Sequence, residues 1–381
     1  MKALYRYSLL ILLYIAFLTG CVEPYAPPVI ESDTNYLVVD GFVNSTDGTA
    51  TVKLSRAIPL SSTDSPPAET NATIFVEDDK GNRTALLGDQ AGNYTGSGIP
   101  IDMGSKYRLR VRTFDTKEYL SDYIELKESP PIDDLKFIPG DNSISIVVST
   151  HDDTGDSRYY QWSYDETWEY TAVYVSGLIW VDGEIIDRPY SEYVHRCWRT
   201  TSSKHIIINS SEKLQQDMIS EFPVVNISKG SQKLFIKYSM LLKQRVLTRE
   251  AYDYWEELQK TTESLGGLFD PQPGKVTGNI HNVSDTGEPV LGYFSGGSVQ
   301  EKRFFIGLLD LPDHLKAFQT VGNCTLDTLL LADVPNYYPD FNELIGTANN
   351  GPILIGYTYS SKSCADCRTQ GGTTTKPAFW Q

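Results

Sequence analysis

The cysteines are the residues of this sequence with the clearest chemical potential. The chain contains five of them, and Cys364 and Cys367 are separated by only two residues. A Cys-x-x-Cys pair forms a redox centre when it lies between a strand and a helix, and it can also supply two thiolate ligands to zinc. This pair lies in a Gly- and Thr-rich segment, which argues against the redox centre. With His195 and Cys197 it gives four ligands of the type that a zinc site uses.

Disulfides are the stronger interpretation of the same residues. In an exported chain, an even set such as Cys197, Cys324, Cys364 and Cys367 is typical of two disulfides, for which three pairings exist. Zinc thiolates are less expected in an oxidising compartment, so the sequence predicts no metal site. We favour long-range bonds that tie the C-terminal tail to Cys197 and Cys324, because closing a longer loop constrains the unfolded chain more.

The fifth cysteine, Cys21, follows a leader sequence. Lys2 and Arg6 precede an apolar stretch over residues 7–18, which is shorter than the roughly 20 residues that span a bilayer as a helix. Small residues at 19 and 20 would fit the narrow cleft of a signal peptidase. The sequence therefore predicts a lipoprotein signal peptide over 1–20 and lipidation of Cys21, which would anchor the protein to a membrane.

Two acidic groups are candidates for further chemistry. Asp152, Asp153 and Asp156 could offer oxygen ligands to calcium, but they lack the alternating spacing of a calcium loop. A solvated turn between two strands is the better interpretation.

The second group places Asp165, Glu166 and Glu169 near Trp162 and Trp168. Carboxylates beside aromatic rings can bind a sugar or act as acid and base in glycoside hydrolysis. Aromatic strand positions are more often core residues, so we expect no catalytic site here.

No motif in the sequence indicates an enzyme. The chain has no Gly-x-Ser-x-Gly elbow, no His-Glu-x-x-His, no phosphate-binding loop and no dinucleotide fingerprint, so we expect no cofactor. Its formal net charge of −16 would repel nucleic acid, which excludes a phosphate-backbone partner.

The elements that must position these residues are mainly β-strands. Residues 21–35 are polar and Pro-rich, as expected of a tether. Between 36 and 128, short strands alternate with turn signals; in 106–113, Tyr107, Leu109 and Val111 fall on one face. This pattern predicts an Ig-like or transthyretin-like β-sandwich.

A second β-rich domain is predicted from 129 to 381, after Ser129-Pro130-Pro131. We expect it to be a larger β-sandwich that contains one helix over about 249–265, which Thr248 can cap and Gly266-Gly267 ends. Its last part, from Asp310, is rich in Pro, Gly, Asn and Thr and would be tied down by the disulfides.

Several motifs along the chain resemble those of the DUF4249 lipoproteins of the Bacteroidota, a family named for its unknown function. The similar segments run in order across the sequence: Tyr36–Gly41, Tyr159–Tyr170, Cys197-Trp198, the helix with Glu250–Trp255, Gly267–Pro273, Gly278–Ile280, Pro289–Phe294 and Cys364–Trp380. The resemblance implies no catalytic residues. It implies a partner protein, because the genes of family members typically lie beside genes for TonB-dependent outer-membrane receptors.

Three functions follow as hypotheses. The first is an outer-membrane lipoprotein, displayed at the cell surface rather than on the periplasmic face, that binds a TonB-dependent receptor and assists ligand capture or uptake. The second is an envelope-assembly scaffold without a ligand of its own. The third is a carbohydrate-active enzyme that uses the Asp165 and Glu166 region.

Overall fold

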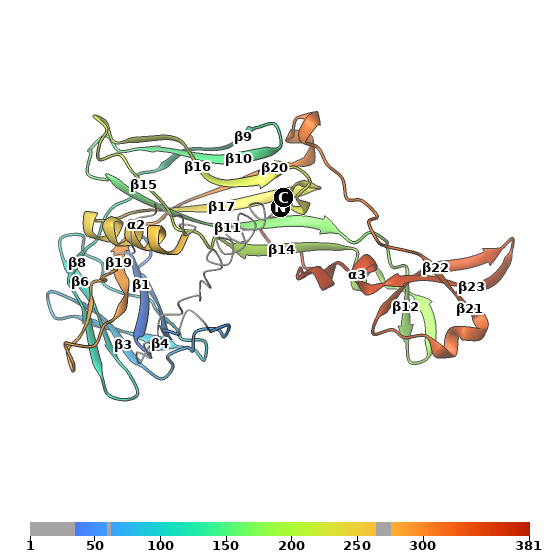
Figure 1. Ribbon diagram of the computed structural model, residues 1–381, viewed down its shortest axis with the longest axis horizontal. Helices are drawn as coiled ribbons and strands as arrows, with labels where there is room; N and C mark the ends of the chain where they lie inside the picture. The colour runs from blue at the N-terminus through green and yellow to red at the C-terminus, as the bar shows by residue number, and fades with distance from the viewer. Residues whose placement is uncertain (1–34, 59–61, 264–275) are drawn as a thin grey trace, which may run out of the picture.

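The fold was analysed in a computed structural model that describes residues 35–58, 62–263 and 276–381. The predicted signal peptide and Cys21 lie outside these ranges, as does all of the tether except Asn35. The described chain is mainly β-structure, arranged as a sandwich, a second two-layered body and a small distal lobe (Figure 1). No helix within the described ranges has both the length and the apolar character needed to cross a bilayer.

The N-terminal sandwich is one ten-stranded sheet that folds over its own core. Strand β4 joins the two layers, since it pairs with β3 on one side and β5 on the other. The predicted alternation in 106–113 is confirmed, because Tyr107, Leu109 and Val111 are all buried. The strands are β1 (Leu37–Asn44), β2 (Thr49–Arg56), β3 (Thr73–Asp78), β4 (Arg83–Gly88), β5 (Asn93–Gly96), β6 (Lys106–Arg112), β7 (Glu118–Ser121), β8 (Ile124–Glu125), β18 (Ile280–Asn282) and β19 (Leu291–Gly297).

Two strands of this sandwich come from a distant part of the sequence. β19 runs parallel to β1, with Val39 opposite Gly292, and β18 pairs with β7. Gly292 has a φ of +115°, and a Cβ there would lie 1.8 Å from the Val39 carbonyl oxygen, so the close pairing requires glycine. The predicted boundary at residue 129 places residues 280–297 in the second domain, whereas in the structure they complete the first sandwich.

The second body packs two sheets face to face. A three-stranded sheet contains β9 (Ile132–Pro139), β10 (Ser143–His151) and β16 (Met218–Ser228). The facing sheet contains β11 (Tyr159–Thr171), β14 (Arg196–Ser202), β15 (Ile207–Ser210), β17 (Lys237–Val246) and β20 (Gln300–Gly307). The core between them holds Ile146, Trp162, Trp168 and Tyr238, which confirms that the aromatic run of 159–170 is largely core.

The expected helix is α2 (Arg249–Glu263), which lies where the second body meets the sandwich (Figure 1). Thr248 Oγ1 accepts a hydrogen bond from the Ala251 amide at 3.2 Å, so the predicted cap is confirmed. Tyr254 packs its ring against Tyr293 of β19 with 5.0 Å between centroids. The predicted end of the helix near Leu265 lies outside the described residues.

The distal lobe lies at the opposite end of the molecule from the sandwich (Figure 1). It combines a hairpin of β12 (Leu178–Val181) and β13 (Glu184–Asp187) with a sheet of β21 (Asp327–Leu330), β22 (Asn342–Asn350) and β23 (Ile353–Ser361). Its small core contains Leu178, Leu329, Tyr337 and Leu344. The helix α3 (Lys362–Ala365) and a 3-10 turn, η6 (Cys367–Gln370), lead from the lobe back to the second body.

Candidate interaction lobe

One disulfide joins the tail to the second body, and a second closes the base of the lobe. Cys197 of β14 is bonded to Cys367 across 170 residues, and Cys324 is bonded to Cys364 across 40. Both bonds tie the tail to Cys197 and Cys324, as favoured from the sequence, which left open which tail cysteine bonds which partner. With these sulfurs joined in pairs, none is a thiolate ligand, so the alternative zinc site with His195 does not form. Within the described ranges, no group of three or more His, Cys, Asp or Glu is arranged to hold a metal ion.

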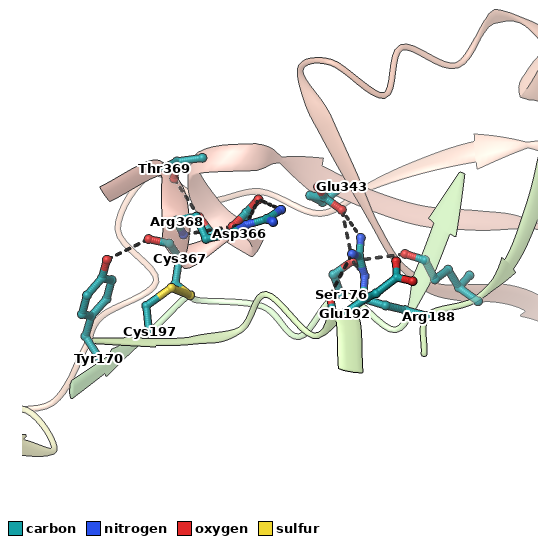
Figure 2. A network of polar contacts seen from close by, with 11 residues as sticks. Tyr170, Ser176, Arg188, Glu192, Cys197, Glu343, Asp366, Cys367, Arg368 and Thr369 are labelled. Carbon is teal, nitrogen blue, oxygen red and sulfur yellow. Dashed lines mark hydrogen bonds and ion pairs between the residues drawn. A yellow bond between two sulfur atoms is a disulfide. The ribbon is translucent and has the colours of Figure 1, made fainter. Parts of the chain in front are cut away.

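Hydrogen bonds reinforce the Cys197–Cys367 attachment (Figure 2). Tyr170 of β11 donates its hydroxyl to the Cys367 carbonyl at 2.8 Å. The Asp366 carboxylate caps the turn η6 by accepting the Arg368 backbone N–H at 2.9 Å and also bonds the Arg368 guanidinium. Burial opposes ionisation of Asp366, but these hydrogen bonds outweigh it and lower the pKa of the carboxyl. The attachment is therefore a covalent bond within a buried polar network.

A buried ion pair holds the hairpin of the lobe against its sheet. The Arg188 guanidinium, after β13, bonds the Glu343 carboxylate of β22, and both residues are less than a tenth exposed. Arg188 also donates to Ser176 Oγ at 3.1 Å and to the Glu192 carbonyl at 3.2 Å (Figure 2). Burial raises the pKa of Glu343, and the Arg188 guanidinium offsets part of that rise. Because the other N–H groups of the guanidinium are also hydrogen-bonded, this buried pair fixes how the hairpin packs against the sheet.

The predicted acidic groups serve as structural contacts. Asp165 and Glu166 are consecutive in β11, so their side chains point to opposite faces of the sheet and do not converge. Glu166 accepts hydrogen bonds from Lys233 at 2.6 Å and from Tyr238 at 3.1 Å. Asp165 pairs with Lys243 at 2.8 Å; burial opposes its ionisation, but this contact and one from Ser202 lower its pKa.

The turn that contains Asp152, Asp153 and Asp156 is also explained by local bonds. Asp152 accepts hydrogen bonds from the Thr154 amide at 2.9 Å and from the Thr154 hydroxyl at 2.7 Å. The side chain of Asp153 is 95% exposed. These contacts fit a solvated turn between β10 and β11.

The lobe carries many large exposed apolar side chains for its size, although single ones such as Leu309, Phe114 and Leu87 are more exposed elsewhere in the described chain. Phe341 is 74% exposed, Tyr338 68% and Ile353 66%, although all three lie in or beside an ordered sheet. Further apolar side chains on the lobe are more than a third exposed, namely Val181, Ile186, Leu330, Leu331, Leu354 and Ile355. Many exposed apolar groups on one small element are typical of a protein interaction surface.

The charged residues of the lobe are almost all acidic. Within residues 176–188 and 325–361 the single basic side chain is Arg188, which is buried against Glu343. The exposed charges are Asp182, Glu184, Asp187, Asp327, Asp333 and Asp340. An apolar surface with acidic neighbours suits a protein partner with basic groups around an apolar patch, and it is repelled by anionic lipid headgroups.

Comparison with known proteins identifies the family. The model of a domain of unknown function, DUF4249, matches residues 22–303. The chain belongs to the DUF4249 family. No curated protein matches it. The match spans the sandwich, the second body and the hairpin of the lobe, whereas β21, β22 and β23 follow the matched segment.

The sequence analysis did not identify the lobe as a separate unit. One local signal was present: apolar runs on both sides of Asp182-Gly183 are typical of a two-residue hairpin. The structure forms this hairpin, and both turn residues have positive φ, +49° and +94°. Nothing local to Arg188 or Glu343 indicates that they pair, because 155 residues separate them.

Proposed function

We propose that this DUF4249 protein is a lipid-anchored lipoprotein of the bacterial outer membrane, of the kind found in Bacteroidota. In this proposal it binds a TonB-dependent receptor through the distal lobe and assists the capture or uptake of a ligand. The observation that carries the proposal is the exposed apolar surface of the lobe, which a rigid attachment presents at one end of the molecule.

Three further features support this proposal. The apolar leader followed by Cys21 has the length and composition of a lipoprotein signal. Two disulfides suit an oxidising compartment outside the cytoplasm. The lobe lies far from the sandwich, which follows the proposed anchor in sequence, so the tethered end and the docking end would be different parts of the molecule (Figure 1).

Co-purification from solubilised membranes tests receptor binding. We expect the wild-type protein to bring down an outer-membrane barrel protein, and the double variant Tyr338→Ser/Phe341→Ser to recover at least about tenfold less, as for loss of interface hot spots. Phe114→Ser is the matched control, because Phe114 is an equally exposed aromatic on the sandwich, at 81%. Failure of the wild type to bring down any barrel protein would overturn the proposal, as would full recovery with the lobe variant.

Two experiments test the location. Cys21→Ser should abolish lipidation, as seen by mass spectrometry of the N-terminal peptide, and should shift the protein from the membrane to the soluble fraction. Proteolysis of intact cells should degrade the protein if it faces outward, whereas full protection would place it on the periplasmic side. Deletion of the gene should impair uptake of one nutrient; broad envelope defects would instead favour a scaffold.

A further inference from the structure

A pocket of about 690 Å³ lies where the tail crosses the second body, beside the base of the lobe. It is lined by Glu169 of β11, by Val175, and by residues 190–198 and 374–381. Cys197 lies within residues 190–198 and Cys367 precedes residues 374–381, so their disulfide holds these two segments near each other. The volume is within the range of small-molecule sites, and the walls are fixed by covalent and ion-pair contacts.

One wall of this junction pocket is aromatic. Tyr190 and Tyr193, in and after the 3-10 turn η1 (Tyr190–Glu192), have their ring centroids 5.2 Å apart at an angle of 65°. Tyr190 is 87% exposed, so most of its ring is free to contact a ligand. A rigid aromatic ring offers apolar area at a low entropy cost, and its electron-rich face attracts polarised C–H groups.

Two positively charged side chains, Arg196 and Lys376, also line the pocket, together with the buried carboxylate of Glu169. Glu169, which is 6% exposed, forms an ion pair with Arg196 Nη1 at 2.9 Å and accepts a hydrogen bond from Trp380 Nε1 at 3.1 Å. The Arg196 side chain is 60% exposed, so the buried carboxylate orients it while its other N–H groups stay open to the pocket. Lys376 also lines the pocket and has no ion-pair partner among the described residues.

His195 adds a hydrogen-bond acceptor to the pocket. Its Nδ1 lies 3.2 Å from the Tyr174 carbonyl oxygen, which can only accept, so Nδ1 carries the proton. Burial lowers the pKa of His195, so the ring is neutral near pH 7 and Nε2 accepts. Ser191 and Thr374 supply hydroxyl groups at the same pocket.

We propose that the junction pocket binds an acidic saccharide, with a sugar ring against Tyr190 and its carboxylate at Arg196 and Lys376. The C–H face of a pyranose complements the tyrosine ring, and a carboxylate complements a preoriented guanidinium. Hydroxyl groups of the sugar bond His195 Nε2, Ser191 and Thr374. This assignment names the ligand class for the proposed role in ligand capture and therefore rests on that role.

Titration of the full-length protein, purified in detergent, tests the assignment directly. The probe is trigalacturonate, the neutral comparison is maltotriose, and inorganic phosphate tests for a response to charge alone. Trp198 and Trp380 line the pocket, so their fluorescence reports occupancy, and calorimetry gives the affinity. We expect trigalacturonate to bind at least about tenfold more tightly than maltotriose, as for one charge-assisted contact.

Two variants locate the binding. Tyr190→Ala should weaken trigalacturonate binding roughly tenfold without unfolding the protein, because the ring is exposed. Lys376→Met should remove most of the preference for the acidic sugar while leaving maltotriose binding unchanged. Phe341→Ala on the lobe is the matched control and should bind trigalacturonate like the wild type.

The assignment fails if no trigalacturonate binding occurs below about millimolar concentration, if maltotriose binds equally, or if Tyr190→Ala binds normally. A response to phosphate as strong as that to trigalacturonate would show anion binding only, and tighter binding of an acidic peptide would assign the pocket to peptides. Both results overturn it. Because this assay contains no receptor, its failure is distinct from failure of the lobe to bind a barrel protein.

Discussion

The N-terminal sandwich and the distal lobe are both β-structures, but they use apolar residues in opposite ways. In the sandwich, alternate residues of β1, β2 and β6 are almost fully buried, and two distant strands close its edges. In the lobe, a core of a few residues supports a surface with many exposed apolar side chains. The sandwich is stabilised by its own core, since burying apolar area is the main driving force for folding.

The stability of the lobe depends instead on disulfides and on a buried ion pair. Cys324–Cys364 joins the two ends of its sheet segment, Cys197–Cys367 attaches the tail to the second body, and the Arg188–Glu343 pair holds its hairpin. A small unit with a limited core needs such bonds to stay folded. The comparison indicates that many apolar residues of the lobe lie on its surface and not in its core, as the proposed contact with a partner requires.

The largest expected loss of stability follows removal of the disulfide that closes the longer loop. The variant Cys197→Ala/Cys367→Ala should lose about 5 kcal/mol of unfolding free energy in the lobe and tail, because the bond closes 170 residues. The Cys324–Cys364 bond closes only 40 residues, so the variant Cys324→Ala/Cys364→Ala should lose about 1 kcal/mol less unfolding free energy than the first variant. Hydrogen exchange of peptides from 325–381 measures both losses.

The sandwich is the internal control for these variants. Peptides from 37–112 should keep their exchange protection when either disulfide is removed, because neither bond touches the sandwich core. An equal loss of protection in the sandwich would show that the two regions unfold as one unit, and the comparison would then be wrong.

The second prediction concerns the buried pair. Arg188→Met should destabilise the lobe by about 3–4 kcal/mol, because Glu343 would remain buried without its counter-charge. Replacing both partners, as Arg188→Met/Glu343→Leu, should restore stability to within about 1 kcal/mol of the wild type. Urea denaturation with exchange of 325–361 measures the difference. If the double variant is as unstable as the single one, the pair stabilises the lobe by more than compensating the buried charge of Glu343.

Whether a feature could be predicted from the sequence depends on how far apart in the chain the interacting residues lie. The alternation in β6, the capped helix α2 and the mainly β fold depend on neighbouring residues, and the structure confirms them. The parallel pairing of β1 with β19 and the Arg188–Glu343 pair join residues far apart in the chain, which local patterns cannot indicate.

The candidate site was harder to predict because exposure is a tertiary property. Phe341 and Ile353 are residue types that usually lie in a core, and only the folded structure shows that they face solvent. The cysteines were a partial exception. Loop-closure entropy favoured bonds from the tail to Cys197 and Cys324, but the two ways of forming them close loops of nearly equal length, so the sequence could not choose between them.

The third prediction compares one apolar residue from each region. Leu109→Ala in the sandwich should cost about 3 kcal/mol, since Leu109 is 1% exposed and leaves a cavity. Phe341→Ala in the lobe should change stability by less than about 0.5 kcal/mol, because its ring is mostly in solvent. Thermal and urea denaturation of both variants measure these costs. A large loss for Phe341→Ala would mean that the ring supports the lobe, and its role in docking could no longer be separated from folding.

A smaller loss of stability than that of Leu109→Ala is expected at Asp366, which caps the turn beside Cys367. Because the folded-state pKa of Asp366 lies below its ordinary value of 3.8, its charge stabilises the fold above that value. This stabilisation is lost as the pH falls through the folded-state pKa. Asp366→Asn should therefore cost about 1 kcal/mol at pH 7, and the wild type and variant should converge below pH 3.8.

Urea denaturation at a series of pH values from 7 to about 3 measures this convergence. A constant difference across that range would show that the amide fails to cap the turn for reasons of geometry, and that the carboxylate charge is not what holds the tail. Asp79→Asn in the sandwich is the matched control. Asp79 lies in an exposed turn outside the attachment of the lobe, so this variant should leave the tail's exchange protection unchanged at every pH.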